Sequence, residues 1–256
     1  MTRNLPPDPA RFGQVLLGIA IVGLAAVGFA FTAFVRNWQP VPIWMPGQPA
    51  LSVISNLVLL GAGAGLLIPR LARPAAFTLS GFLLLWVVLL HLPAIASQPA
   101  TFPAWTYLGG VWTVAMGAWI LGMRLGPPDG RTHAPASRLI DLARRSIGPA
   151  LILYGVSHLL FADYMIGLVP GIVPFKLQLL YATGLCHAAA GLAIMFAVVP
   201  RTAALLEATM LTSFVVFVDV ANALTKGTRP PLTASCFELA LAASVWIIAG
   251  SYRDRD

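Results

Sequence analysis

Six polar side chains in the second half of this 256-residue sequence have the types needed to bind a polar headgroup or to move a proton. They are His158, Asp163, His187, Asp219, Asn222 and Glu238, and each lies within or beside a long apolar stretch. Histidine exchanges a proton near neutral pH, and a nearby carboxylate balances the charge that it gains. Ionisable groups within a membrane are costly, and they commonly mark ligand or ion sites. We therefore treat these residues as the candidate ligand-binding set.

Helical rise along the apolar stretches predicts how deep each residue lies. His158 falls past the middle of its stretch, and Asp219 falls in the outer third of another, with Asn222 on the same helical face. Glu207 falls near the opposite, cytoplasmic end and is left out. The expected cluster at the outer-leaflet end consists of His158, Asp219, Asn222 and Glu238, with Asp163 and His187 beside it.

Each member also has an interpretation without a function. His187 can hydrogen-bond a neighbouring helix and so act only in packing. Asp219 can pair with Lys226 or Arg229 at the rim of the membrane, and Asp163 can lie in the interface. Several ionisable groups that converge on one end are harder to explain by packing alone, so a binding site remains the working hypothesis.

The sequence has no motif for a resident metal or cofactor. Because no H-x-x-x-H or E-x-x-H spacing occurs within one expected helix, we predict no metal site. The two cysteines, Cys186 and Cys236, lie on different helices and form no C-x-x-C, which argues against disulfide catalysis and haem attachment. No cofactor is identifiable, although a quinone is compatible with the site, and catalysis by this chain alone is not expected.

The composition is that of a membrane protein. The chain is 58% hydrophobic and 10% charged, with a mean hydropathy of +0.83, whereas soluble domains carry about 25% charged residues. A bilayer span needs about 20 apolar residues, so the sequence predicts an all-α transmembrane fold of eight helices. The expected spans are 13–35, 50–68, 75–93, 104–123, 147–168, 177–199, 203–224 and 233–250.

Lysine and arginine predict the orientation of these spans. Twelve of the 16 fall on the side of the N-terminus and four on the other side, so the positive-inside rule places both termini in the cytoplasm of a bacterial-type inner (plasma) membrane. The net charge of +7 follows from this bias. The arginines do not gather on one face with aromatics, so nucleic acid is not an expected partner, whereas membrane lipid is.

A short motif recurs at half the chain length, a spacing that we name the half-chain offset. V-P-x-x-x-P occurs at 41–46 and again at 169–174, which indicates a tandem duplication. We predict two parallel four-helix bundles related by a pseudo-twofold axis along the membrane normal. The first repeat covers 1–125, a cytoplasmic linker covers 126–146, and the second repeat covers 147–256. At the half-chain offset His158 aligns with Ala30, and only His91, opposite Asp219, keeps an ionisable group. The second repeat is therefore expected to carry the function and the first to be structural.

The two motifs lie in short connections on the outer side, which we name the first cap (38–49) and the second cap (165–175). Both caps are rich in proline, apolar and aromatic residues. Trp38, Trp44, Trp105 and Tyr107 fit an aromatic belt at that interface. The caps either anchor the protein in the interface or cover a cavity, which we expect under the second cap.

The second half resembles the DoxX-like membrane proteins. The resemblance rests on G-x-x-H at 155–158, the V-P-x-x-x-P cap and Y-x-T-G at 181–184, and the first half is a degraded copy. It implies a four-helix unit and a redox-associated role, as an accessory subunit that binds a quinone- or lipid-like molecule beside a membrane redox protein or larger complex. A non-enzymatic scaffold and a transporter of protons or small solutes are the alternatives.

Overall fold

The structure is a computed structural model that describes residues 8–126, 134–171 and 173–252, with the backbone alone at 134–136. Every regular element within these residues is helical, which confirms the all-α class. Seven helical segments of the described chain are long and apolar enough to cross a membrane. They are α1 (Pro9–Ala30), α2 (Gln48–Leu67), α3 to α4 (Ala72–Ser97), α5 (Phe102–Arg124), α9 (Lys176–Met195), α10 to α11 (Pro200–Lys226) and α12 (Arg229–Ser251). The chain is therefore a multi-pass membrane protein.

The fifth expected span, 147–168, is not one helix. After α6 (Ala134–Ser146), helix α7 covers only Gly148–Leu160, and the short α8 covers Ala162–Ile166. Thirteen residues of α-helix rise about 20 Å, whereas the hydrocarbon core is about 30 Å thick. The continuous apolar sequence predicted one helix, because hydropathy does not record where the backbone turns.

Helix bounds recur between the halves. At the half-chain offset the bounds of α2 recur as those of α9, and the bounds of α3 (Ala72–Trp86) recur as those of α10 (Pro200–Phe214). Helix α3 passes into the π-helical turn η2 (Val87–His91), and α10 passes into the π-helical turn η3 (Val215–Asp219). The bounds of these two turns also match at the half-chain offset. The turns are followed by α4 (Leu92–Ser97) and α11 (Val220–Lys226). Since π-helical turns are rare and often lie at functional sites, their recurrence sets His91 and Asp219 in equivalent places.

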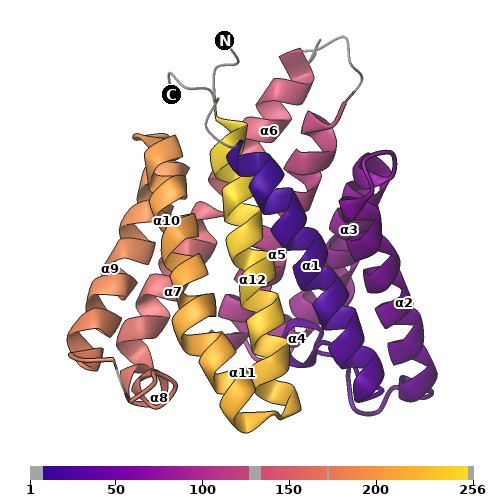
Figure 1. The fold of residues 1–256 in the computed structure, drawn as a ribbon, viewed down its shortest axis with the longest axis horizontal. Coiled ribbons are helices and arrows are strands. Elements are labelled where there is room, and N and C mark those ends of the chain that lie inside the picture. The colour runs from indigo at the N-terminus through magenta and orange to yellow at the C-terminus, as the bar shows by residue number, and fades with distance from the viewer. Residues whose placement is uncertain (1–7, 127–133, 172, 253–256) are drawn as a thin grey trace.

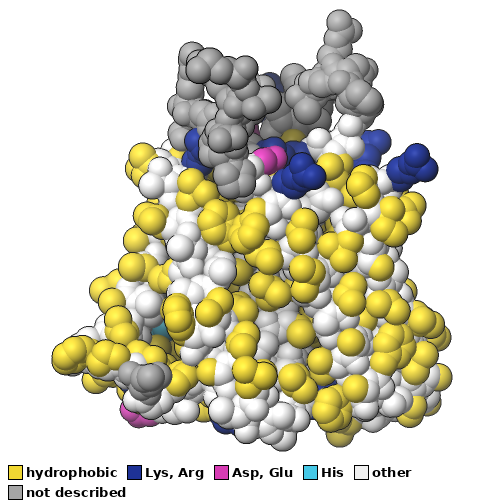
Figure 2. All heavy atoms as spheres, viewed as in Figure 1, with side chains coloured by type: hydrophobic (Ala, Val, Ile, Leu, Met, Phe, Trp, Pro, Cys, Tyr) yellow, Lys and Arg dark blue, Asp and Glu magenta, His cyan; other side chains and the backbone are white. Residues whose placement is uncertain are grey.

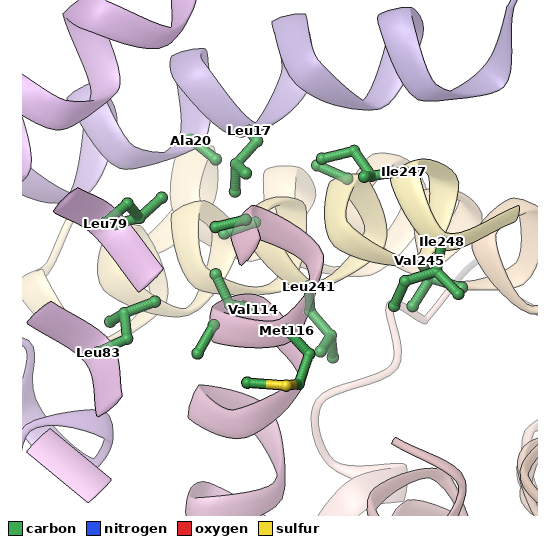
Figure 3. Close-up of a cluster of buried hydrophobic side chains, with 14 of the residues drawn as sticks. Leu17, Ala20, Leu79, Leu83, Val114, Met116, Leu241, Val245, Ile247 and Ile248 are labelled. Atoms are coloured by element: carbon green, nitrogen blue, oxygen red, sulfur yellow. The ribbon is translucent and has the colours of Figure 1, made fainter. Parts of the chain in front are cut away.

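The two halves share one core rather than standing apart. In the first half α1 packs on α2, α2 on α3 and α3 on α5; in the second α7 packs on α9, α9 on α10 and α10 on α12. Helix α12 also packs extensively on α1 and on α5, in the middle of the molecule (Figure 1). Figure 3 shows Leu17 of α1, Leu79 of α3 and Val114 of α5 beside Leu241 and Ile247 of α12. The largest apolar core therefore joins first-half helices to the last helix.

Close glycine contacts align α1 with α7. A Cβ atom on Gly63 would lie 3.1 Å from the Gly18 carbonyl oxygen, and a Cβ atom on Gly191 would lie 2.6 Å from the Gly148 carbonyl oxygen. Gly63 and Gly191 match at the half-chain offset, whereas their partners Gly18 and Gly148 are spaced two residues further apart. By these contacts His158 corresponds to Gly28, and the sequence alignment with Ala30 is two residues out of register.

Basic residues gather at one end of the molecule, which we name the basic end. The start of α1 and the end of α12 also lie there, and α4, α8 and α11 lie at the opposite end (Figure 1). Figure 2 shows arginine side chains grouped at the basic end above an apolar flank. Four arginines of the cytoplasmic count, Arg3, Arg131, Arg253 and Arg255, and the linker residues 127–133 lie outside the described residues.

Candidate functional site

A buried histidine–glutamate pair lies inside the second half. His187 of α9 and Glu207 of α10 are almost completely buried, and the His187 Nδ1 atom lies 2.6 Å from the Glu207 Oε1 atom. The second carboxylate oxygen, Oε2, is also buried and has no hydrogen-bond partner among the described residues. Our expectation that Glu207 lies apart from the site is wrong, because α9 and α10 run antiparallel and bring the two side chains to the same depth.

His158 of α7 lies beside this pair. Its ring centroid is 5.0 Å from that of His187, and its Nδ1 atom lies 2.8 Å from the Tyr154 carbonyl oxygen. A carbonyl only accepts, so Nδ1 carries the proton and a neutral His158 ring offers Nε2 as an acceptor. Nδ1 of His187 faces a carboxylate, so a neutral His187 also offers Nε2. Gly184 makes room, since a Cβ atom there would lie 2.8 Å from the Cβ atom of His158.

Aromatic rings border the two histidines. The Phe214 ring centroid lies 6.3 Å from that of His158 and 5.9 Å from that of His187. The Tyr154 ring centroid lies 6.1 Å from that of His187. We name His158, His187 and Glu207, with Tyr154 and Phe214 around them, the histidine cluster. It combines a few polar atoms with aromatic walls, as small-molecule sites commonly do.

The histidine cluster is accessible from the lateral surface. His187 is buried, whereas His158 is half-buried. Figure 2 shows a histidine side chain at the surface, in the gap between α9 and α10. Exposed apolar side chains lie on these helical segments, including Leu185 on α9 and Phe217 on η3. This flank faces lipid in a membrane, so the approach to the cluster is apolar.

The structure divides the residues expected to form one cluster. Asp219 interacts electrostatically with Glu238, and both are partly buried. Among the described residues no hydrogen bond or ion pair joins His158 to either carboxylate. Tyr154 lies between the two groups, because its hydroxyl interacts electrostatically with Glu238 and with Glu207. The expected contact of His158 with Asp219 is therefore replaced by contact with His187.

The remaining two candidates lie at the second cap. The Asn222 Nδ2 atom donates to the Leu168 carbonyl oxygen at 2.8 Å and to that of Val218 at 2.9 Å, which ties α11 to the cap. Asp163 is exposed on α8. Both residues thus lie apart from the histidine cluster, and Asn222 has a structural contact. Arg229 donates to the Phe34 carbonyl oxygen, and no ion pair joins it to Asp219 within the described residues.

Two cavities of the described chain lie at the first cap, and a cavity under the second cap stays a prediction. One has a volume of about 360 Å³ and the other of about 230 Å³. Ile172 of the second cap lies outside the described residues. Trp38, expected in an interfacial belt, is half-buried and stacks on Phe237 at 4.2 Å between centroids, so one face of its ring packs on the core. In the same described part, no three His, Cys, Asp or Glu side chains are placed to hold a metal ion.

The comparison of the two halves contained a signal for Glu207. Leu59 and Leu79, both completely buried, occupy the first-half positions that match His187 and Glu207 at the half-chain offset. In the second half an imidazole and a carboxylate replace both leucines. A paired replacement of this kind indicates that the two side chains contact each other. Depth estimated from helix rise obscured this pairing.

Comparison with known proteins locates the same half. Residues 147–252 match a domain of unknown function (DUF8561), from the end of α6 to the end of α12. The matched segment contains the whole histidine cluster, together with Asp219 and Glu238. No curated protein and no solved structure matches the chain.

Proposed function

We propose that this chain binds a quinone-like or lipid-like small molecule at the histidine cluster, entering from the lipid side, as an accessory subunit of a membrane redox system. The observation that carries the proposal is the buried His187–Glu207 pair, with His158 beside it at the lateral opening. Quinone carbonyls need hydrogen-bond donors, and their reduction consumes protons. The electrons would come from the partner redox protein, since the sequence has no motif for a resident redox centre.

The chemistry of the cluster suits such a ligand. A carbonyl oxygen of the ligand can accept a hydrogen bond from a protonated His158 ring. The Glu207 carboxylate at hydrogen-bond distance from the His187 Nδ1 atom fixes the orientation of that ring. The Phe214 and Tyr154 rings can pack on the planar headgroup. The apolar flank of α9 and η3 suits the tail of the ligand.

Binding of decylubiquinone to the purified full-length protein tests this proposal. We expect a saturable rise in thermal stability on titration, because a ligand that binds only the folded state stabilises it. His158→Ala should abolish the rise, while Asp163→Asn, a change at an exposed acidic residue outside the cluster, should leave it unchanged. A rise of equal size in the wild type and in His158→Ala would place the quinone elsewhere and overturn the proposal.

We also propose an arrangement in the membrane: two four-helix units of DoxX-like type, related by a pseudo-twofold axis along the membrane normal, with the basic end in the cytoplasm. The recurring bounds of α2, α3 and η2 support the repeat. The grouping of arginine at one end supports the orientation. Single cysteines at Ser137 and Gly47, in a background without Cys186 and Cys236, should label from opposite sides of an inner membrane. Labelling from one side would contradict the orientation.

Proton transport is the second candidate, and the position of Glu207 favours it. Glu207 lies at the middle of α10, nearer the basic end than Asp219, which lies beyond the end of α10 at the last position of η3. Tyr154 interacts electrostatically with Glu207 and with Glu238, the partner of Asp219, and so connects the two acidic groups. Proteoliposomes loaded with a pH-sensitive dye distinguish the candidates, because a transporter would dissipate an imposed pH gradient without any quinone.

A further inference from the structure

The larger of the two cavities lies where the first cap meets the last helix. Its volume is about 360 Å³. Its lining mixes polar and apolar residues, and the polar ones include Arg36, Gln39, Gln48, Ser52 and Arg229. Arg36 comes from η1 (Arg36–Trp38) in the first half, whereas Arg229 is the first residue of α12. The cavity thus exists only because the two halves pack together.

Two cations meet in this cavity without an anion. The charges of Arg36 and Arg229 act on each other. Among the described residues neither guanidinium has a carboxylate partner; the ion pairs there are Arg124–Asp8, Arg144–Asp141 and His187–Glu207. The Arg229 Nη2 atom donates to the Phe34 carbonyl oxygen, which leaves the other donors of this guanidinium available. Two like charges held together repel, and a bound anion removes that cost.

The backbone also positions one of these cations. Arg36 has a φ angle of +33°, in the left-handed region that residues with a Cβ atom rarely adopt. Strain of this kind persists where the surrounding structure holds it, and ligand sites are common places for it. The end opposite the basic end carries four lysines and arginines, namely Arg36, Lys176, Lys226 and Arg229. Two of them, Arg36 and Arg229, line this cavity.

The smaller cavity adjoins the larger one and is apolar. Its volume is about 230 Å³, and it shares Phe34, Gln39 and Val41 with the larger cavity. The other lining residues are Met45, Leu51, Ile54, Ser55, Phe82, Leu85, Trp86, Leu89 and Leu90, from the first cap, α2, α3 and η2. Ile54 and Leu89 are more than half exposed, so this groove opens onto the lipid-facing flank.

We propose that the two cavities together bind one anionic phospholipid. The phosphate lies between Arg36 and Arg229, and one acyl chain lies in the groove beside Ile54. The Gln48 Nε2 atom already donates to the Pro42 and Ile43 carbonyl oxygens, so Gln48 offers its Oε1 atom as an acceptor to a hydroxyl of the headgroup. A cationic cavity that adjoins an open apolar groove at the end of the helices matches the headgroup and chain of a lipid in the outer leaflet. A free phosphate or glycerol phosphate offers the same headgroup chemistry, but it would leave the groove unused.

Native mass spectrometry of the full-length protein in detergent tests the headgroup half of the proposal. Dioleoyl-phosphatidylglycerol should remain bound more tightly than dioleoyl-phosphatidylcholine, whose choline cation opposes the arginines. Arg36→Gln and Arg229→Gln should each weaken retention about tenfold or more, as expected for the loss of a charged hydrogen bond. Arg229→Lys should restore part of it. Lys226→Gln, a change at an exposed cation of the same end that does not line the cavity, should leave retention unchanged.

The groove is tested by filling it. Ile54→Trp should weaken retention of the phospholipid, whereas Leu57→Trp, at an equally exposed position on α2 outside the groove, should not. Retention of sn-glycerol 3-phosphate as tight as that of the lipid would show that a free anion is the ligand. Equal retention of the two lipids, or the same loss in Lys226→Gln as in Arg36→Gln, would overturn the site.

Discussion

The two halves hold different side chains at the same pair of facing positions. In the first half, α2 and α3 carry Leu59 and Leu79, which are completely buried in the core. In the second half, α9 and α10 have the same bounds at the half-chain offset and carry His187 and Glu207, whose nearest polar atoms lie 2.6 Å apart. One helix pair therefore accommodates either two apolar side chains or a buried polar pair, and the interior can change its chemistry without any change in helix bounds.

A second exchange accompanies the first. In the first half Asn56 of α2 lies over Gly28 of α1, where a Cβ atom would collide with the Asn56 side chain. In the second half the polar residue and the glycine change helices, since His158 of α7 lies over Gly184 of α9. The Asn56 side chain donates to the Ala33 carbonyl oxygen near the first cap. His158 instead points its ring toward His187. The polar residue at this helix contact thus supports the first cap in the first half, and it belongs to the histidine cluster in the second half.

Breaking the buried pair should have the largest effect. His187→Leu leaves Glu207 buried without its partner, so we expect the free energy of unfolding to fall by about 3–5 kcal/mol. The double variant His187→Leu/Glu207→Leu reproduces the residue types of the first half, and it should cost less than the sum of the single changes. Denaturation in detergent measures all three variants. Additive losses would show that the two residues do not stabilise each other.

A smaller effect is expected from filling the space under His158. A Cβ atom from Gly184→Ala would lie 2.8 Å from the His158 Cβ atom, and overpacking of this kind costs about 1–3 kcal/mol. The displaced ring should also reduce decylubiquinone binding. Gly61→Ala is the control, because a Cβ atom there meets nothing within 4 Å. If both variants bind the quinone equally, the position of His158 does not matter for binding.

His91 sharpens the comparison, since it occupies the place of Asp219 at the end of the matching π-helical turn. Its Nε2 atom lies 2.9 Å from the Trp38 carbonyl oxygen, so it supports the first cap. We expect His91→Ala to lower the free energy of unfolding by about 1–3 kcal/mol and to leave decylubiquinone binding unchanged. A loss of binding at constant stability would show that the first half takes part in the proposed function.

The smallest expected effect is a coupling energy. His158 and Asp219 lie in separate groups, so a double-mutant cycle of His158→Ala and Asp219→Asn should give less than about 0.5 kcal/mol, as for independent sites. The matched cycle of His158→Ala with His187→Leu should give more. Thermal stability in detergent supplies both values. A large coupling in the first cycle would restore the single cluster that the sequence alone predicts.

The sequence predicts the helical segments better than it predicts the pairing of side chains. Apolar length and proline placement locate α1, α2, α5 and α12 within a few residues, because membrane spans require long apolar segments. Composition cannot reveal the end of α7 at Leu160 or the two π-helical turns, which depend on backbone hydrogen bonds. Depth along a helix placed Glu207 far from His187, although the position-by-position comparison of the halves pairs them. The two cavities arise from packing between helices distant in sequence, which no local pattern contains.

Helix α1 is synthesised long before α12, the helix on which it packs most extensively. The two helices approach so closely that a Cβ atom on Gly13 would lie 2.8 Å from the Ile247 backbone nitrogen. The ribosome begins α12 about 200 residues after it completes α1, and at about 5–20 residues per second this takes on the order of 10–40 s. During this time α1 is in the bilayer without α12, and its glycine face contacts lipid or the insertion machinery. A chain truncated before Arg229 keeps α1 and leaves that face permanently uncovered.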